Sequence, residues 1–360
     1  MRSDLPSATT DPSTPGLDRR TFVRRGLGVG AAVSLPSWVL SACGPSEESD
    51  KGASGGAVTV KATHGTGLCN LGIFLEKERK LAGSAVNLKF VVTPTNADIA
   101  TLFGAGQVDA SLIPYSNFMT LYDQGAPVSI VAGGGVEGCV VCAQPGIANA
   151  EALRGKTLGT FQADTLEMLA LDYLQTSGMD FDDVEVKYFG TSPELASAFI
   201  AGKIDAISHI EPYSTQALRA VKGSVKLTDG VDVYKKGYTD CVLAVRDPLI
   251  KESPEAVKAL IKGLMTAQRQ AETDREAAVK LTTGTYYKAS YADVLDASTK
   301  QPNVVDQRGN TQFMLDRAEN LKKLGYIKKL PGREAFDYRL LEQVIKDEAK
   351  LYESLKLKYS

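Results

Sequence analysis

The sequence predicts a two-lobed α/β protein in which each lobe is a mostly parallel sheet flanked by helices. The first observation is an internal repeat. The segment AGQVDA at 105–110, followed by Pro-Tyr-Ser, returns as AGKIDA at 201–206, again followed by Pro-Tyr-Ser. The second is that short apolar runs around both copies alternate with segments whose apolar residues lie three and four positions apart, which is typical of strands alternating with helices. Such alternation favours parallel sheets.

Each copy predicts three strands with helices between them. The strands are expected at 58–63, 86–92 and 108–113, and again at 157–161, 184–189 and 204–209. Helices at 68–81 and 166–176 follow the first strands, and capping residues begin the next helices at 95–98 and 192–194. Gly106 and Gly202 fit the position just after a helix end, where a left-handed backbone is common. Asp109 and Asp205 recur after them and indicate a turn or strand-edge role.

The remaining chain sets the predicted lobe boundaries. An apolar run at 241–245 predicts one further strand, and the chain after residue 253 is almost wholly helical with no third copy. We therefore expect residues 57–146 and 242–360 to form the first lobe, including the C-terminal helices, and residues 147–241 to form the second. The chain is expected to cross between lobes near 144–150 and to return near 238–246. Two crossings make a hinge about which the lobes close on a ligand.

The N-terminal residues predict export. Arg19-Arg20 and Arg24-Arg25 precede a Gly- and Ala-rich apolar segment too short to remain as a transmembrane helix, which resembles a twin-arginine signal peptide over residues 1–42. Leu40-Ser41-Ala42-Cys43 resembles a bacterial lipobox, in which Cys43 takes the lipid. Residues 43–56 form a polar tether. We expect a lipoprotein on the extracytoplasmic face of the cell membrane (periplasm or outer surface). The alternative is an ordinary cleaved signal that contains a cysteine.

Composition excludes several function classes. A net charge of -2 gives no reason to expect nucleic acid as a partner. The two histidines, His64 and His209, build no credible metal set and no Ser-His-Asp or Cys-His constellation. His209 lies at a strand end and is expected to be packed. We predict no catalysis, no cofactor and no metal, and a monomer.

The mature chain keeps four cysteines, Cys69, Cys139, Cys142 and Cys241, and three complete pairings are possible. Cys139 and Cys142 lie three apart in a predicted strand, too far for one disulfide. Buried free thiols are the first expectation, and a Cys139–Cys241 bridge is the alternative. The run Gly133-Gly134-Gly135 lacks the Lys-Ser/Thr of a phosphate loop, so a strand-end bend or hinge contact is expected.

Ligands of open α/β sheets bind beyond the carboxyl ends of the strands. Six loops fulfil that condition, at 64–68, 93–96, 114–117, 162–165, 190–192 and 211–214. They are rich in Thr, Ser, Asn, Gln and Gly, which suits hydrogen bonding to a small polar molecule. None contains Arg or Lys. An anionic ligand would therefore depend on helix N-termini, His64 and neutral donors.

Several segments are similar to the substrate-binding proteins of nitrate, taurine and sulfonate ABC importers, a group with relatives that bind thiamine-pyrimidine precursors. The resemblance covers about 58–330 and is carried by AGQVDA at 105–110, LRGKTLG at 153–159, AGKIDA at 201–206 with Glu211-Pro212, and Ala126-Pro127-Val128. It implies a type II periplasmic-binding-protein fold and delivery of a solute to a permease and ATPase complex. The ligand contacts that it implies are His64, Thr66, Gly67, Asn96, Tyr115, Ser116, Asn117, Gln162, Asp164, Thr165, Glu211 and Tyr213.

The ligand class stays open at this point. The family suggests a sulfonate, a carboxylate or a pyrimidine-like heteroaromatic molecule, whereas Asp164 and Glu211 suit an amine, an amide or a heteroaromatic N–H. Glu211 precedes a proline and is equally suited to cap the following helix. Two other functions remain, a sensor of ligand occupancy and a cofactor-dependent enzyme resembling pyrimidine synthases on the same fold.

Overall fold

The computed structural model describes residues 56–93 and 96–360. The twin-arginine segment, Cys43 and most of the tether lie outside these residues, so the predictions made for them stay predictions. Within the described part, no helix is both long enough and apolar enough to cross a membrane.

The first of two five-stranded sheets has the strand order β2-β1-β3-β10-β4. Strands β1 and β2 pair in parallel, as do β1 and β3, whereas β10 pairs antiparallel with both β3 and β4. Four strands therefore run in one direction and β10 alone runs against them. The bounds are Val58–His64 (β1), Val86–Phe90 (β2), Ala110–Pro114 (β3), Val128–Gly133 (β4) and Cys241–Arg246 (β10).

The second sheet repeats this plan in the order β7-β6-β8-β5-β9. Here β5 is the reversed strand, antiparallel to β8 and β9, while β6 pairs in parallel with β7 and β8. The bounds are Cys139–Ala143 (β5), Thr157–Thr160 (β6), Glu185–Tyr188 (β7), Ala206–Ile210 (β8) and Val225–Thr228 (β9). The predicted pair of mostly parallel sheets is confirmed, and the strand positions agree with the sequence within a few residues.

One lobe boundary differs from the prediction. Strand β5 was expected in the first lobe, because residues 57–146 were assigned to it, but β5 pairs in the second sheet. The first crossing therefore lies between β4 and β5, at residues 134–138, and not at 144–150. All five residues of β5 are buried. A wholly apolar run is typical of any central strand and does not indicate which of two sheets it enters.

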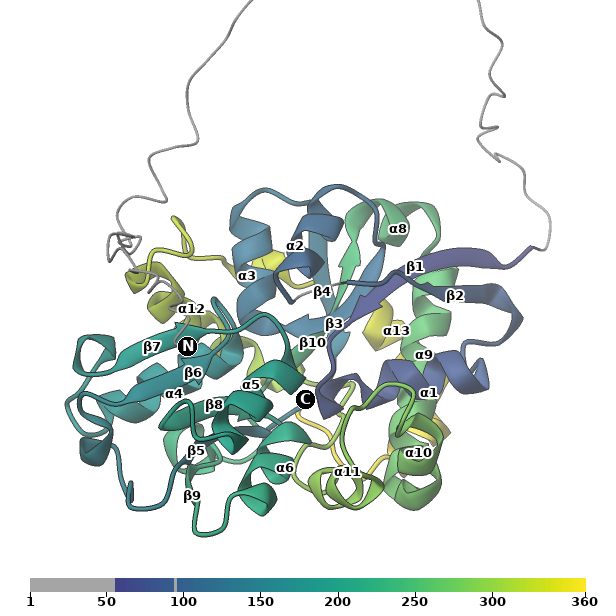
Figure 1. The fold of residues 1–360 in the computed structure, drawn as a ribbon. Coiled ribbons are helices and arrows are strands. Elements are labelled where there is room, and N and C mark those ends of the chain that lie inside the picture. The colour runs from purple at the N-terminus through teal and green to yellow at the C-terminus, as the bar shows by residue number, and fades with distance from the viewer. Residues whose placement is uncertain (1–55, 94–95) are drawn as a thin grey trace, which may run out of the picture. The chain divides into compact units, whose positions relative to one another are not determined.

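Helices cover both faces of the first sheet (Figure 1). One core places α1, α9, α10, α11 and α13 against Val60, Leu243 and Val245, and another places α2, α3 and α12 against Ile113 and Val242. A third core joins α4, α5 and α6 to the second sheet. The bounds are Leu71–Arg79 (α1), Asn96–Gly104 (α2), Tyr115–Asp123 (α3), Thr165–Gln175 (α4), Ser192–Ile200 (α5), Tyr213–Ala220 (α6), Val231–Tyr234 (α7), Asp247–Glu252 (α8), Pro254–Thr273 (α9), Arg275–Thr282 (α10), Tyr291–Ala297 (α11), Thr311–Lys323 (α12), Arg339–Asp347 (α13) and Ala349–Ser354 (α14).

The repeated Gly-x-x-Asp segments have the same structural role in both sheets. Gly106 and Gly202 follow α2 and α5 with φ of 69° and 68°, a left-handed backbone that glycine adopts without steric cost. Three residues later, Asp109 Oδ2 accepts a 2.9 Å hydrogen bond from the Lys61 backbone N–H, and Asp205 Oδ2 accepts one of the same length from Thr157 N–H. Each aspartate thus ties its own strand to the neighbouring one, as the sequence predicted.

The two crossings lie side by side. The Asp240 N–H donates to the Gly135 carbonyl at 3.1 Å, and the Glu137 N–H donates to the Tyr238 carbonyl at 2.9 Å. A Cβ at Gly135 would collide with the side chain of Cys69, so glycine is required for this approach. The expectation that Gly133–Gly135 is a bend with hinge contacts agrees with this placement. It also positions residue 240 between the two sheets.

Candidate ligand site

A cavity lies at the carboxyl ends of the strands of both sheets and admits water-sized spheres over about 40 Å³. The loops after β1, β3, β6, β7 and β8 contribute to it, together with the crossing before β10. Among the described residues, its lining is Gly65, Thr66, Gly67, Cys69, Asn70, Ile99, Leu112, Pro114, Asn117, Phe161, Asp164, Leu166, Ser192, Ile210, Asp240 and Cys241. The cavity is therefore narrow and encloses space for only a small group.

Asp164 lies at the N-terminus of α4, where its Oδ1 accepts a hydrogen bond from the Leu166 N–H at 3.1 Å and caps the helix. The side chain is buried. The pKa of Asp164 is raised to about 7, chiefly by burial and then by the charge of Asp240, while the hydrogen bonds from Leu166 and Thr165 oppose this shift. Near neutral pH this carboxyl is thus close to its midpoint and responds to any charge placed beside it.

Asp240 is the second buried carboxyl of the cavity. Its Oδ1 accepts from the Thr165 hydroxyl at 2.7 Å, and its Oδ2 accepts from Gln301 Nε2 at 2.8 Å. Burial is the largest influence on the pKa of Asp240 and raises it, against hydrogen bonds from Thr165 and neighbouring thiols. The carboxyl is therefore fixed in place by donors from α4 and from the C-terminal segment.

The cavity wall contains two buried carboxyls and one buried amide oxygen that lacks a partner among the described residues. That oxygen is Asn70 Oδ1, and the Asn117 amide donates one of its two N–H groups to the Ala163 carbonyl at 3.0 Å. No Lys, Arg or His side chain is among the described residues that line the cavity. The arrangement can accept hydrogen bonds and neutralise positive charge. It offers no cationic side chain to an oxyanion.

Four of the residues that the sequence singled out line the cavity: Thr66, Gly67, Asn117 and Asp164. Thr165 is buried directly behind it, bonded to Asp240. Gly67 is a point of close approach between the sheets, because a Cβ there would lie 2.8 Å from Ile210 Cγ1. The neighbouring Leu68 N–H donates to the Glu211 carbonyl at 2.8 Å.

His64, Tyr115, Ser116 and Gln162 lie elsewhere. His64 packs edge-on against Phe74 and Phe90, with ring centroids 4.7 Å apart in both pairs, and burial lowers its pKa. Tyr115 and Ser116 are fully buried in α3, and Gln162 is exposed. None of the four is in the cavity lining. Asn96 is the first residue of α2, and its side chain lies outside the described part.

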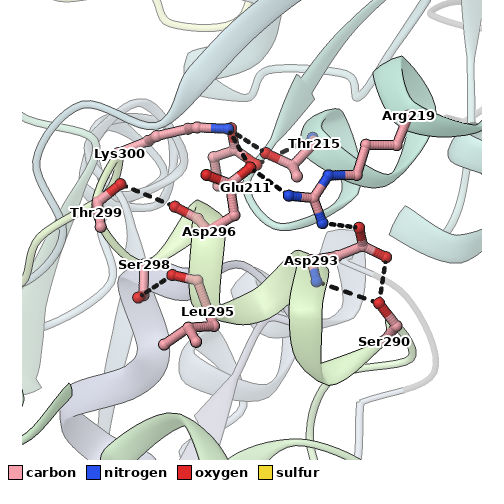
Figure 2. Close-up of polar contacts among 10 residues, drawn as sticks. All are labelled: Glu211, Thr215, Arg219, Ser290, Asp293, Leu295, Asp296, Ser298, Thr299 and Lys300. Carbon is pink, nitrogen blue, oxygen red and sulfur yellow. Dashed lines mark hydrogen bonds and ion pairs between the residues drawn. The ribbon is translucent and has the colours of Figure 1, made fainter. Parts of the chain in front are cut away.

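Glu211 and Tyr213 lie outside the lining as well. Glu211 Oε2 accepts from the Thr215 N–H at 3.1 Å, so this side chain caps α6. Figure 2 shows Glu211 beside Lys300, which bonds to Thr215 and Asp296 at 2.8 and 3.0 Å. The buried ring of Tyr213 stacks on His209, and its hydroxyl accepts from the Lys288 N–H at 3.2 Å. His209 is itself buried, as expected.

Sequence reasoning missed four polar residues of this wall, Cys69, Asn70, Asp240 and Cys241. All four described cysteines are buried free thiols, which was the first expectation. The alternative Cys139–Cys241 bridge is absent, and the two residues begin strands of different sheets. A carboxylate directly before an apolar strand, at 240–241, was the signal that could have drawn attention to this wall.

Comparison with solved structures identifies the class of fold. The ligand-binding component of an ABC-type import system from Staphylococcus aureus, with zinc bound, has a TM-score of 0.70 at 16% identity, over 79% of this chain and 98% of that one. The periplasmic nitrate-binding protein NrtA of Synechocystis also has a TM-score of 0.70, at 14% identity over 84% and 92%. The desulfurization enzyme DSZB has a TM-score of 0.57 at 14% identity, over 81% and 99%. The chain has the periplasmic-binding-protein fold.

Comparison of the sequence with protein-family models identifies the family. The model of the NMT1/THI5-like family matches residues 82–278, which include strands of both sheets, and the chain belongs to this family. A Brucella abortus protein named "Putative binding protein" is 30% identical over 142 residues. That match covers 39% of this chain and 44% of the relative, so the chain aligns with less than half the length of the curated relatives.

Proposed function

We propose that the chain is the solute-binding component of an ABC importer and that its solute is a small organic cation or an N–H-rich heteroaromatic molecule. The observation that carries this proposal is the cavity wall formed by Asp164, Asp240 and Asn70, which has two buried carboxyls, an amide oxygen without a partner among the described residues and no cationic side chain. The structural neighbour from an ABC-type import system of Staphylococcus aureus supports the transport role, and the relative named as a putative binding protein is consistent with it.

Electrostatics favours a donor ligand over an oxyanion. An oxyanion in this cavity would lie beside two buried carboxyls and would raise the pKa of both still further, so it could bind only where both are protonated. A protonated amine or ring N–H would instead satisfy Asn70 Oδ1 and favour the ionised forms of Asp164 and Asp240. We therefore set aside sulfonate and carboxylate ligands, which the family resemblance suggested, in favour of the donor class.

A thermal-shift titration of the purified chain tests the proposal. We expect small amines and aminopyrimidine-like bases to stabilise the protein by about 2.7 kcal/mol at 100 times the dissociation constant. Nitrate and alkanesulfonates should give no stabilisation. Asp164→Asn should weaken binding of the active compound at least tenfold, and the exposed Glu185→Gln in the same lobe is the matched control. Stabilisation by an oxyanion that Asp164→Asn leaves intact would contradict the donor class.

Cellular uptake separates import from sensing. Cells that lack the chain should lose uptake of the identified solute and regain it with the intact gene. We propose in addition that Cys43 carries the lipid, which predicts that Cys43→Ala moves the protein out of the membrane fraction. If uptake persists without the chain while a transcriptional response to the solute is lost, the sensor alternative is favoured.

A further inference from the structure

Three buried groups converge at the end of the cavity next to the crossings. Cys69 Sγ and Cys241 Sγ lie 2.8 Å apart, and Cys241 Sγ lies 3.2 Å from Asp240 Oδ2. One ligand atom from each of Cys69, Asp240 and Cys241 lies within 4.8 Å of the others, and all three residues are buried. Two thiols and a carboxyl in one cluster are the ligand types of zinc sites.

We propose that Cys69, Asp240 and Cys241 bind a zinc ion whose fourth coordination position faces the cavity. All three residues line the cavity, so the remaining position is open toward water or a solute atom. Three protein ligands with one open position are typical of zinc sites that exchange a ligand, whereas structural sites are closed by four. The site goes beyond the proposed transport role and would exist whether or not an organic solute is bound.

The surrounding residues hold the ligands in the way that metal sites require. Thr165 and Gln301 each donate to one oxygen of Asp240, at 2.7 and 2.8 Å, and thereby fix its orientation. Asn70 Nδ2 lies 3.2 Å from Cys69 Sγ and can donate to a thiolate there. A third thiol, that of Cys139, lies 3.5 Å from Asp240 Oδ1 on the other side of the carboxyl. Thiols therefore lie near both oxygens of the Asp240 carboxyl.

A Cys69–Cys241 disulfide is the competing interpretation of the same pair. The 2.8 Å separation lies between a disulfide bond of about 2.05 Å and the roughly 3.8 Å between two thiolates on a tetrahedral zinc. The Asp240 carboxyl beside the two thiols favours the zinc site over the disulfide. A disulfide would leave the Asp240 carboxyl with only neutral hydrogen-bond donors, those of Thr165 and Gln301, whereas zinc supplies positive charge and uses all three groups.

Zinc and cobalt titrations of the full-length chain test the site. We expect one zinc per reduced chain and, with Co²⁺, a thiolate-to-metal charge-transfer band. Cys241→Ser should weaken zinc binding at least tenfold and diminish that band. Cys142→Ser is the matched control, because Cys142 is buried in β5 outside the cavity lining and its loss should change neither. The cobalt spectrum of the unsubstituted protein remains decisive even if a variant does not fold.

The outcomes distinguish this site from the proposed transport role. Absence of the cobalt band in the reduced protein, or zinc affinity unchanged in both Cys241→Ser and Cys69→Ser, would overturn the zinc site. So would a Cys69–Cys241 disulfide in peptide maps together with no zinc binding after reduction. Organic solutes are titrated separately into zinc-free and zinc-loaded protein. Zinc binding without any organic ligand would contradict the proposed solute class and leave the metal site standing.

Discussion

The hydroxyl of Thr165 donates a 2.7 Å hydrogen bond to Oδ1 of Asp240 and so joins the first turn of α4 to the crossing that leads into β10. Both side chains are buried. The second donor near that oxygen is the Cys139 thiol at 3.5 Å, which is a weaker partner. Thr165 is therefore the main partner of Oδ1 and, together with Gln301 at Oδ2, holds the Asp240 carboxyl in the cavity wall.

Replacing Thr165 by valine removes this donor with little change in shape. Oδ1 of Asp240 would keep only the weak Cys139 thiol as a donor, and a buried acceptor that loses its main partner costs about 1–3 kcal/mol, so Thr165→Val should lower the free energy of unfolding by up to that amount in urea denaturation. Thr165→Ser keeps the hydroxyl and should recover most of the loss. Equal destabilisation by valine and serine would show that packing of the methyl group, and not the hydrogen bond, is what matters.

The absence of a side chain at Gly67 allows the loop after β1 to approach Ile210 of the second sheet. A Cβ at this position would lie 2.8 Å from Ile210 Cγ1, closer than real contacts allow, so Gly67→Ala should hold the cavity open. We expect ligand affinity to fall about 5- to 30-fold, from about 1–2 kcal/mol of overpacking. Calorimetric titration of the ligand found by thermal shift measures it.

Gly65 supplies the control for that experiment, because it lines the same cavity and its nearest heavy atom to a new Cβ is Asn70 Nδ2 at 3.4 Å. Gly65→Ala should therefore change affinity little. Adding Ile210→Ala to Gly67→Ala removes the clashing atom and should restore part of the lost affinity. An affinity that stays low in the double variant would contradict the steric explanation.

The repeat explains how much of the fold the sequence could predict. Gly106 and Gly202 with Asp109 and Asp205 are local signals, since each acts within a few residues of its own helix and strand. These signals were sufficient to predict the strands of both sheets. The sheet to which β5 belongs is a tertiary choice, and five apolar residues fit either sheet equally well.

The site was predicted less completely because part of it is also formed by tertiary contacts that local sequence patterns do not indicate. Loop positions after strands indicated Thr66, Gly67, Asn117 and Asp164, which do line the cavity. Asp240 reaches the same wall from the crossing before a reversed strand, where the rule for parallel strands gives no expectation. His64 lies at the end of a strand as expected, yet its ring packs against Phe74 and Phe90 and lies outside the cavity lining.

Arg219 in α6 bridges the second sheet's helices to the C-terminal helices packed on the first sheet. Its guanidinium bonds to Asp293 at 2.8 Å and to Asp296 at 2.9 Å, both in α11 (Figure 2). Exposed pairs of this kind contribute about 0.2–1 kcal/mol each. Arg219→Ala should therefore weaken ligand binding about two- to thirtyfold at low ionic strength, and the difference should shrink as salt is added.

Arg154 is the matched control for Arg219, because it is also an exposed arginine but pairs with Asp183 within the second lobe. Arg154→Ala should leave ligand affinity unchanged at every salt concentration. An equal loss of affinity in both variants would indicate a general effect of removing positive charge and would contradict a specific contact between α6 and α11.

We expect the buried carboxyl of Glu76 to make the stability of the protein depend on pH, independently of the ligand site. It is buried in α1, its Oε2 has no hydrogen-bond partner among the described residues, and Gly263 of α9 lies directly against it. Burial raises the pKa of Glu76 to about 7 from an ordinary value of 4.5, while backbone N–H groups of Ala82 and Leu81 oppose the shift by less. The folded protein therefore favours the protonated acid.

Because the pKa is raised on folding, the unfolded chain loses this proton first as pH increases. Stability is full below the unfolded value and falls as pH rises from about 4.5 to about 7, by up to about 1.4 kcal/mol per pH unit. Glu76→Gln carries a neutral amide and should lack this component. The difference in free energy of unfolding between variant and parent, measured by denaturant titration, should thus grow across that window and level off above it. A difference that stays constant from pH 4 to pH 8 would show that the buried carboxyl does not titrate there.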